Sequence, residues 1–416
     1  MKFSSILLLQ ILLGWMVIQI VLMLIFVFYL RLSKSKSLSN SQLPKTAVIL
    51  CLRGSDPFLP HCLTALLQQD YPLYDLKIVV DSQEDPAWQV AQDTVAGATN
   101  VQISPLKVAS TACSLKCSSL VQAVSELDSS YKVVALVDAD AVVHSTWLRE
   151  LVTPLMHPKV GATTGNRWYI SQGRYWGTLV RYVWNVSAVI QMYLYGICWG
   201  GTLAIKTQVI HETRMLEKWA RAYNEDTMVQ SILAKHGLRV KFVSSLLILN
   251  REECTLAGLM NWMKRQLLAS RLYHPKWWLV VMESVFSILL PNVILALVLV
   301  NLFLGRQDIS LTLFTCYSIY LFGVILIITV VETAVRRVIN NSRLMPKISP
   351  SLLIKTFIGL PLTHWFYGFA LMSSMWISKV SWRKIIYHIK SPFNIVLTEY
   401  HPYQSDNQEV DKQISL

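Results

Sequence analysis

Two aspartates that follow a short apolar segment have the type and spacing needed for chemistry. Val133–Val137 is a run of five apolar residues, and Asp138 and Asp140 come directly after it, separated by one alanine. Two such carboxylates can share a divalent cation and the diphosphate that the cation neutralises. In open α/β sheets, ligands bind beyond the carboxyl ends of the strands. The pattern therefore predicts a site for a metal ion and a phosphorylated ligand, with a solvated turn as the alternative.

Two further carboxylate positions lie at the ends of predicted elements. Asp81 follows the apolar run Leu76–Val80, and Glu225-Asp226 precedes the helical stretch Thr227–His236. Taken singly, Asp81 fits a turn. Asp226 fits a helix cap, because acidic side chains stabilise the start of a helix. Three such sites in one α/β region indicate a ligand-binding constellation instead.

Positive charges and glycines complete the candidate site. Lys116 lies near a predicted loop-to-helix junction and Arg53 near a strand-to-loop junction, positions suited to binding a diphosphate. Gly200 and Gly201 follow an aromatic segment and allow the backbone to approach a ligand closely. A solvated surface charge and a plain turn are the alternatives for these positions.

An α/β pattern from about residue 46 supplies the elements that position these residues. Short apolar runs rich in β-branched residues alternate with helix-length segments, which indicates a parallel sheet covered by helices on both faces. The runs include Ala47–Cys51, Leu76–Val80 and Val133–Val137, and the helical segments lie near 57–69, 86–95 and 114–127. The sequence therefore predicts an α/β catalytic domain over residues 45–250.

Long apolar segments predict that the chain crosses a membrane. Its 416 residues are 53% hydrophobic and only 15% charged, whereas soluble domains carry about 25% charged residues. Ile6–Leu30 is long enough to span a bilayer and lacks the cleavage site of a signal peptide, which predicts a retained anchor. Leu279–Leu304 and Leu311–Val331 are two further spans. Leu352–Ile377 is a weaker candidate because it contains lysine, proline and histidine.

The net charge of +13 is spread along the apolar segments. Charge in that position is typical of membrane flanks and argues against a nucleic-acid partner. Arg31, Lys34 and Lys36 follow the first span, so the positive-inside rule places the catalytic domain in the cytoplasm. Basic residues on both sides of 352–377 conflict with a span there, and a re-entrant or interfacial segment would resolve the conflict.

The predicted order of regions has the catalytic domain between membrane segments. The helix Leu256–Tyr273 fits either the membrane interface or a surface of the catalytic domain. The regions are 1–36 (membrane anchor), 45–250 (catalytic domain), 251–278 (interfacial helix region), 279–378 (transmembrane helices) and 379–416 (basic segment and polar tail).

Five motifs in this order resemble glycosyltransferase family 2. They are Val79-Val80-Asp81-Ser82, Leu115-Lys116-Cys117-Ser118, Val137-Asp138-Ala139-Asp140, Trp199-Gly200-Gly201-Thr202 and Asn224-Glu225-Asp226. The closer resemblance is to the ceramide glucosyltransferase-like branch, which includes hopanoid-type lipid glycosyltransferases. It covers about residues 45–275, with an echo at Val380-Ser381-Trp382-Arg383.

The resemblance implies a nucleotide-binding GT-A domain with a mixed, mostly parallel sheet, a UDP-sugar donor and a divalent metal, Mg or Mn. By motif match, Asp81 contacts the nucleoside and Asp138 the nucleotide. Asp140 binds the metal, and Asp226 is the base that deprotonates the acceptor hydroxyl. The other matching positions for the nucleotide-sugar are Lys116, Gly200 and Gly201. Members with this single-carboxylate arrangement invert the anomeric configuration.

One motif of the resemblance is altered. Processive synthases and ceramide glucosyltransferases carry (Q/R)xxRW after the catalytic carboxylate, but here Gln266 and Arg271 have the wrong spacing and Leu272 stands where tryptophan is expected. Arg265, Gln266 or Arg271 is still expected to reach the donor diphosphate or the acceptor. The altered motif and the small number of spans argue against processive polymer synthesis.

The sequence thus predicts a membrane-bound inverting glycosyltransferase. It would transfer a single sugar to a ceramide-like or hopanoid-like lipid at the cytoplasmic face of a plasma or inner membrane. A polysaccharide synthase-type enzyme and a non-catalytic membrane scaffold are the alternatives. Donor choice is expected to depend on loops such as 163–175, and the acceptor groove on the aromatic segment Tyr169–Tyr195.

Overall fold

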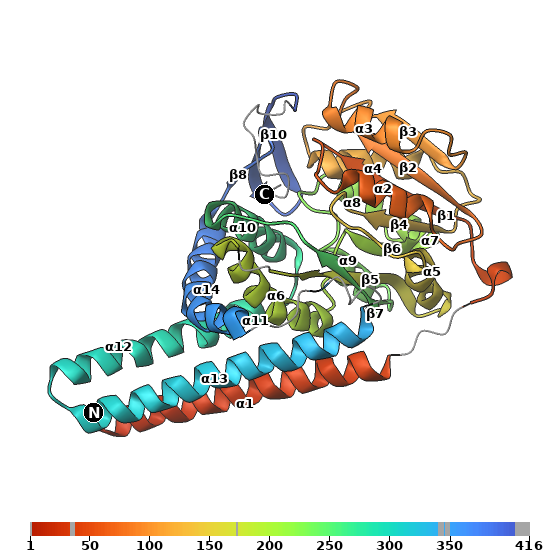
Figure 1. Cartoon of the computed structure of the whole chain (residues 1–416). Coiled ribbons are helices and arrows are strands. Elements are labelled where there is room, and N and C mark those ends of the chain that lie inside the picture. The colour runs from red at the N-terminus through yellow and green to blue at the C-terminus, as the bar shows by residue number, and fades with distance from the viewer. Residues whose placement is uncertain (1, 34–37, 172–173, 340–344, 346–349, 404–416) are drawn as a thin grey trace.

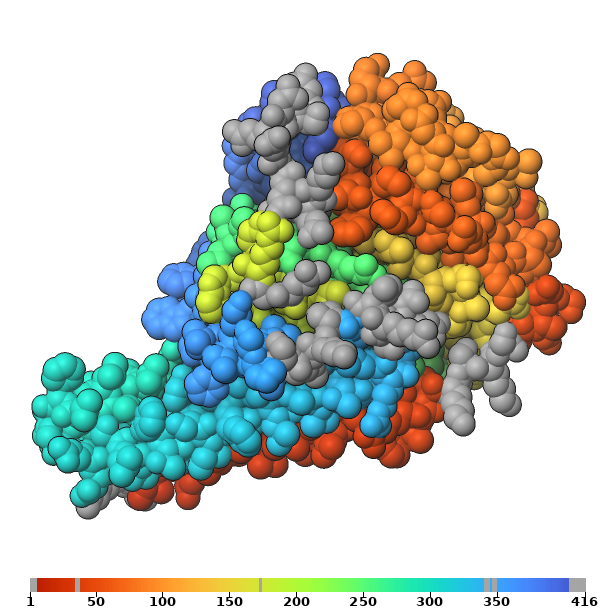
Figure 2. All heavy atoms as spheres, in the orientation of Figure 1, coloured from red at the N-terminus to blue at the C-terminus, as the bar shows by residue number. Residues whose placement is uncertain are grey.

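A computed structural model of the chain describes residues 2–33, 38–171, 174–339, 345 and 350–403. These residues form an α/β body from which an arm of long helices projects (Figures 1 and 2). The body is built around a seven-stranded sheet. A small three-stranded sheet near the C-terminal end lies beside it.

The large sheet has the strand order β3-β2-β1-β4-β6-β5-β7. β6 is antiparallel to both of its neighbours, whereas the other pairs are parallel. The predicted mixed, mostly parallel sheet is therefore confirmed. The strands are β1 (Thr46–Leu52), β2 (Tyr74–Val80), β3 (Val101–Pro105), β4 (Val133–Val137), β5 (Val160–Tyr169), β6 (Thr202–Lys206) and β7 (Arg239–Asn250).

Helices cover both faces of this sheet, which explains why its central strands are apolar throughout. Along β1, Val48 and Leu50 point into one core and Ile49 into the other, since successive side chains of a strand point to opposite faces. The helices of the body are α2 (Leu59–Leu67), α3 (Pro86–Thr94), α4 (Leu115–Ser125), α5 (Trp147–Val152), α7 (Thr207–Glu212), α8 (Met215–Trp219) and α9 (Val229–Lys235), with 3₁₀ turns at η1 (Asn40–Gln42) and η2 (Thr153–Met156).

A layer of helices joins the body to the arm. α10 (Leu256–Tyr273) packs against α6 (Trp176–Tyr195) and α14 (Pro350–Trp376). Its buried side chains include Trp262 and Met263, which share a core with residues of α6 and α14. The predicted helix over 256–273 therefore has the predicted bounds and packs on the catalytic body.

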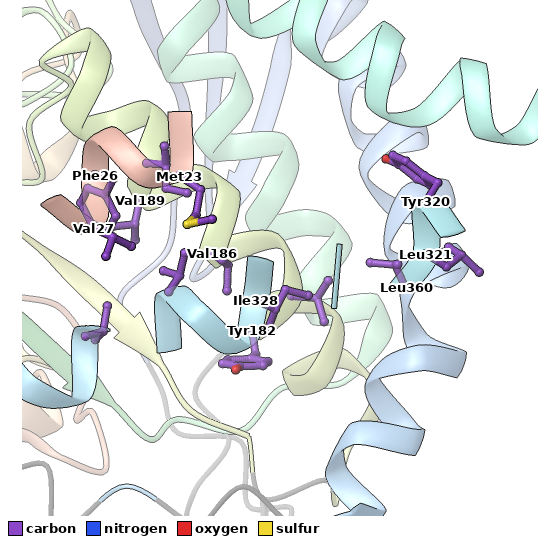
Figure 3. Close-up of a cluster of buried hydrophobic side chains, with 14 of the residues drawn as sticks. Met23, Phe26, Val27, Tyr182, Val186, Val189, Tyr320, Leu321, Ile328 and Leu360 are labelled. Atoms are coloured by element: carbon purple, nitrogen blue, oxygen red, sulfur yellow. The ribbon is translucent and has the colours of Figure 1, made fainter. Parts of the chain in front are cut away.

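Three helical segments are long and apolar enough to cross a membrane: Ile6–Leu32, Trp277–Phe303 and Gln307–Val338. They correspond to α1 (Lys2–Leu32), to α11 (Trp277–Ser284) continued through the π-helical turn η3 (Val285–Leu289) into α12 (Leu290–Phe303), and to α13 (Gln307–Val338). α1 packs along α13, and a shared apolar cluster ties both to α6 and α14 (Figure 3).

α14, the weaker candidate at 352–377, is not among the spans found in the described part of the chain. It packs on α6 and α10 of the body instead.

The region from residue 379 differs from the expected basic segment and polar tail. β8 (Lys379–Trp382), β9 (Ile385–Ser391) and β10 (Asn394–Tyr400) form an antiparallel sheet. Ile385, Tyr387 and Ile389 of β9 are buried in a core with Leu115 and Leu268, so the alternate residues of β9 face the body. The basic residues between them obscured this alternation. The tail from 404 lies outside the described residues.

Candidate active site

A cleft of about 630 Å³ opens at the carboxyl edge of the large sheet. β1, β2 and β4 end at this edge, and the antiparallel β6 begins there, which brings the segment before β6 beside the segment after β4. The structure therefore brings together most of the predicted site residues. Those that line the cleft are Asp81, Lys116, Asp138, Asp140, Asp226, Arg265 and Gln266.

Asp138 is held by three donors. Its Oδ1 lies 2.6 Å from Lys116 Nζ, and its Oδ2 accepts from Trp199 Nε1 at 3.1 Å and from Arg167 Nη2 at 3.2 Å. Burial opposes the ionisation of Asp138, but the charges of Lys116 and Arg167 hold its pKa below the usual value. Asp138 is therefore an anion locked in one orientation.

Lys116 links two of the predicted acidic sites. Its Nζ lies 2.6 Å from Asp138 Oδ1 and 2.6 Å from Glu225 Oε1. Although burial disfavours its charge, the two carboxylates raise the pKa of Lys116 well above its usual value. The lysine thus connects the segment after β4 to the segment before α9.

Asp140 faces a different environment. Its Oδ2 accepts from Asn250 Nδ2 at 2.9 Å and lies 3.9 Å from Arg167 Nη1. Burial raises the pKa of Asp140, and the nearby Asp138 and Asp56 carboxylates add to this rise against the opposing charge of Arg167. The negative charge around Asp140 is therefore less completely neutralised by neighbouring cations than the charge around Asp138.

The acidic groups around Asp140 fit a divalent cation. Asp56, Asp140 and Glu252 all line the cleft and repel one another electrostatically, which a cation would relieve. Among the described residues, no group of three acidic, histidine or cysteine side chains is arranged to hold a metal alone. Mg²⁺ is usually bound through one or two carboxylates together with substrate phosphates. Asp140 and its acidic neighbours suit that kind of site.

Asp226 is buried and lies close to the glycine pair. Its Oδ2 accepts from the backbone N–H of Gly200 at 2.6 Å, and its Oδ1 accepts from Thr227 Oγ1 at 2.9 Å. α9 begins only at Val229, without a side-chain cap, so helix capping does not explain Asp226. Burial and the adjacent Glu225 raise the pKa of Asp226 to about 7. A carboxylate with this pKa suits proton transfer near neutral pH.

The two glycines are explained by close approach to the protein's own carboxylates. A Cβ atom on Gly200 would collide with Glu225, and one on Gly201 would collide with Trp199 and lie 2.7 Å from Asp138 Oδ2. Both predicted positions thus lie at the site. Their absent side chains let the acidic segments before α9 and after β4 meet the start of β6.

Asp81 lines the cleft beside residues of the C-terminal sheet. It forms a buried ion pair with Arg53 and accepts from the Tyr400 hydroxyl at 3.1 Å. Arg53 also donates to the carbonyls of Arg383, at 2.8 Å, and His401, at 2.6 Å. Burial raises the pKa of Asp81 against the opposing charge of Arg53. Asp81 Oδ1 is buried and has no hydrogen-bond partner among the described residues.

The altered motif divides between the cleft and a structural contact. Arg265 and Gln266 line the cleft, and the Arg265 guanidinium lies over the Trp382 ring at 5.8 Å. Arg271 does not line the cleft. It donates to the carbonyl of Met375 in the last turn of α14 and, at 3.0 Å, to the carbonyl of Ile377 just beyond that helix. The structure thus brings two of the three predicted residues to the site.

Several residues of the cleft were missed in the sequence. Arg167 lies within β5 and contacts both aspartates that follow β4, and Glu252 follows β7. Burial raises the pKa of Glu252 to about 7, against the charge of Arg181. The acidic pair Glu252-Glu253, one residue beyond the apolar end of β7, was the available signal. Tyr387 of β9 also lines the cleft and was missed, whereas Arg383, which lines it too, belongs to the Val380–Arg383 segment noted in the sequence.

Comparison with solved structures identifies similar folds. The mannosyltransferase PcManGT from Pyrobaculum calidifontis, solved in complex with GDP-Man and Mn2+, superposes with a TM-score of 0.50 at 14% identity, over 89% of this chain and 99% of that chain. The glucosyl-3-phosphoglycerate synthase from Mycobacterium tuberculosis, in complex with phosphoglyceric acid, gives a TM-score of 0.38 at 11% identity, over 53% of this chain and 79% of that chain. The first match confirms the GT-A fold.

No curated protein sequence matches the chain. The family model that matches is that of glycosyl transferase family 21, over residues 11–395. This match agrees with the ceramide glucosyltransferase-like part of the resemblance, although the motifs indicated family 2. The hopanoid-type branch stays a prediction. The match spans the anchor, the catalytic body and most of the C-terminal sheet, so the chain is a glycosyltransferase and belongs to glycosyl transferase family 21.

Proposed function

We propose that the chain transfers a single sugar from a UDP-sugar to a membrane lipid, with inversion at the anomeric carbon. The observation that carries this proposal is the buried Asp226, whose pKa is raised to about 7, in one cleft with Asp138 and Asp140. A general base, an acidic metal site and cations for a diphosphate are the groups that such a transfer needs.

The nucleotide would extend along the cleft from Asp81 to Asp138. Asp81 Oδ1 is buried without a partner among the described residues, so it can accept a hydrogen bond from a nucleoside. Arg265 and Arg383 line the same cleft and suit the diphosphate, because guanidinium groups pair with phosphate oxygens through several N–H donors.

A divalent metal held by Asp140 would neutralise the charge that develops on the departing diphosphate. The chain's own residues carry the remaining chemistry. Asp226 accepts the proton of the acceptor hydroxyl while the hydroxyl oxygen forms its bond to the anomeric carbon and the bond to the diphosphate breaks. The Gly200 N–H orients the Asp226 carboxylate for this step. Lys116 fixes Asp138 and Glu225 around it.

The position of the cleft supports a lipid acceptor. α10 contributes to the cleft wall and packs against α6 and α14, and both of these helices share an apolar cluster with the membrane-spanning α1 and α13. The three spans in the described chain favour single transfer over polymer export. The basic residues after α1 favour a cytoplasmic site in a plasma or inner membrane.

The test uses the full chain, purified and reconstituted with membrane lipids. UDP-glucose, UDP-galactose, UDP-N-acetylglucosamine and UDP-glucuronate, each labelled in the sugar, are supplied with Mg²⁺ or Mn²⁺. We expect one donor to yield a labelled lipid of fixed size, whose formation stops when the metal is chelated. A product that lengthens with time would favour polymer synthesis. Absence of any labelled lipid, with the Asp140→Ala variant behaving like the wild type, would reject the proposal.

A further inference from the structure

An arginine of β5 lies beside both aspartates that follow β4. Arg167 lines the cleft, with its Nη2 at 3.2 Å from Asp138 Oδ2 and its Nη1 at 3.9 Å from Asp140 Oδ2. β4 and β5 are each antiparallel to β6, which lies between them, so β5 runs in the same direction as β4 and its later residues reach the same edge (Figure 1). One guanidinium is therefore shared by two carboxylates.

Two neutral groups hold Arg167 in this position. Its Nη1 donates to the Tyr169 hydroxyl at 2.9 Å, and its guanidinium carbon lies 4.8 Å from the centre of the Trp199 ring. Tyr169 is itself buried, and the Arg181 guanidinium lies over its ring at 4.1 Å. Aromatic and hydroxyl contacts do not depend on the charge of the aspartates. Arg167 is therefore a positive charge that stays in place when a ligand reaches the aspartates.

The position of this charge opposes a divalent cation. Both oxygens of Asp138 already accept hydrogen bonds, Oδ1 from Lys116 and Oδ2 from Trp199 and Arg167, so a metal ion depends chiefly on Asp140. A cation bound to Asp140 comes close to the Arg167 guanidinium, because that guanidinium already lies 3.9 Å from Asp140 Oδ2. Like charges at such separations repel even in polar surroundings. Arg167 therefore lowers the affinity of Asp140 for a metal ion that arrives alone.

A diphosphate reverses this opposition. Guanidinium groups pair with phosphate oxygens through two parallel N–H donors, and Arg167 lines the cleft proposed for the nucleotide. The negative charges of a diphosphate offset the charge of Arg167 and supply further oxygens to the metal, as is usual where Mg²⁺ is bound by one or two carboxylates. The metal ion and the nucleotide should therefore bind more tightly together than either does alone.

We propose that Arg167 makes metal binding depend on the nucleotide. It disfavours a divalent cation at Asp140 on its own and ceases to do so once a diphosphate has paired with the guanidinium. The proposal rests on the nucleotide-sugar transfer proposed above and gives a role to a residue outside the five motifs. Because such coupling is reciprocal, UDP should tighten the binding of Mn²⁺ by the same factor as Mn²⁺ tightens the binding of UDP.

The test measures the binding of Mn²⁺ to the full chain in nanodiscs, with no sugar and no acceptor. Electron paramagnetic resonance reports the concentration of free Mn²⁺ during a titration, first without and then with UDP. The Mn²⁺–UDP complex that forms in solution is measured separately and subtracted. We expect UDP to lower the Kd of the wild-type protein for Mn²⁺ at least about tenfold, within the usual range of coupling between two ligands.

Substitutions of Arg167 separate its charge from its bulk. Arg167→Gln removes the charge, and we expect it to bind Mn²⁺ about tenfold more tightly without UDP and to lose about tenfold of the tightening by UDP. Arg167→Lys keeps the charge and should stay near the wild type. Arg167→Met gives the same test as glutamine if melting curves show that the glutamine variant does not fold. The matched control is Arg239→Gln, an exposed arginine at the start of β7, which should keep wild-type values.

The outcomes separate this proposal from the proposed function. Tighter Mn²⁺ binding by Arg167→Gln, in a protein whose wild type transfers no sugar to lipid, would reject the function and retain the role of Arg167. Transfer to lipid by the wild type, with an unchanged Kd for Mn²⁺ in the uncharged variant, would retain the function and overturn that role. Weaker UDP binding with unchanged Mn²⁺ binding would make Arg167 a plain phosphate ligand, and absence of Mn²⁺ binding in every protein would overturn the proposal as well.

Discussion

The catalytic cleft and a smaller cavity between α1, α6, α13 and α14, called the membrane-side cavity, lie on either side of one aromatic pair, Trp262 and Trp184, but differ in charge. The cleft is lined by several acidic and basic groups, including Lys116, Asp138 and Arg265, whereas the described lining of the cavity contains Glu283 and no lysine or arginine. The cleft thus has groups for phosphates and a metal. In the cavity, polar side chains pair with one another, as Gln19 does with Ser287 and Ser284 with Tyr367.

This difference indicates that the two spaces suit ligands of different character. A charged donor needs buried charges that are already paired, because an isolated buried charge is costly. The pairs of Lys116 with Asp138 and of Arg53 with Asp81 meet that need. The described lining of the cavity holds no such charge pair. We expect substitutions in the cleft to affect donor chemistry.

Replacing the proposed base tests the cleft most severely. The Asp226→Asn variant keeps the shape of the side chain but cannot accept a proton at neutral pH. We expect the rate of transfer to fall about 1000-fold, within the range for loss of a general base. Initial rates with labelled donor and lipid give the change, and UDP affinity should stay near the wild-type value.

The matched control is Asp93→Asn on α3, which removes an exposed carboxylate outside the cleft. It should transfer sugar at the wild-type rate. A fall of less than about tenfold in Asp226→Asn would remove this residue from the role of a general base.

Replacing the proposed metal ligand should have the next largest effect. Asp140→Asn removes the negative charge and leaves an amide that can still contact Asn250. We expect transfer at saturating donor to fall about 100-fold, since a metal contributes several kcal/mol to the stabilisation of a leaving group. A titration with Mn²⁺ measures both the rate and the half-saturating metal concentration. An unchanged response to the metal would assign its binding to other residues.

The order of motifs at the sheet edge explains why this part of the site was predictable. Asp81 and Asp138 directly follow apolar strands, so their place at the carboxyl edge follows from local sequence and from the general architecture of such sheets. The glycines before β6 were predicted to approach a ligand. In the structure they approach Glu225 and Asp138, a reason that depends on how β6 is inserted.

The other parts of the site depend on contacts between distant segments. Arg167 reaches Asp138 only because β5 lies beside β6 in the sheet. The sequence of neither strand determines this order. Arg383 reaches the carbonyl of Arg53 from a sheet 330 residues later in the chain. The membrane-side cavity arises from the packing of several helices, so periodicity within one helix gives no sign of it.

The pH dependence should show a smaller, graded effect. Asp226 acts as a base only when ionised, and burial together with Glu225 raises its pKa to about 7. The active fraction therefore falls as the pH drops below 7, and kcat/KM should decrease about tenfold per pH unit there. Rates measured from pH 5 to pH 8 at saturating metal test this dependence. A rate that stays constant down to pH 5 would contradict the role of Asp226.

The two arginines of α10 should give the smallest effects and the sharpest contrast between site and scaffold. Arg265 lines the cleft, whereas Arg271 donates to carbonyls at and beyond the end of α14. We expect Arg265→Gln to raise the KM for the UDP-sugar about tenfold, as expected for loss of a charged hydrogen bond. Arg271→Gln should leave that KM unchanged and lower the melting temperature of the purified protein, because the carbonyls lose their donors. If instead Arg271→Gln raised the KM while Arg265→Gln did not, the donor would lie nearer to α14 than the cleft indicates.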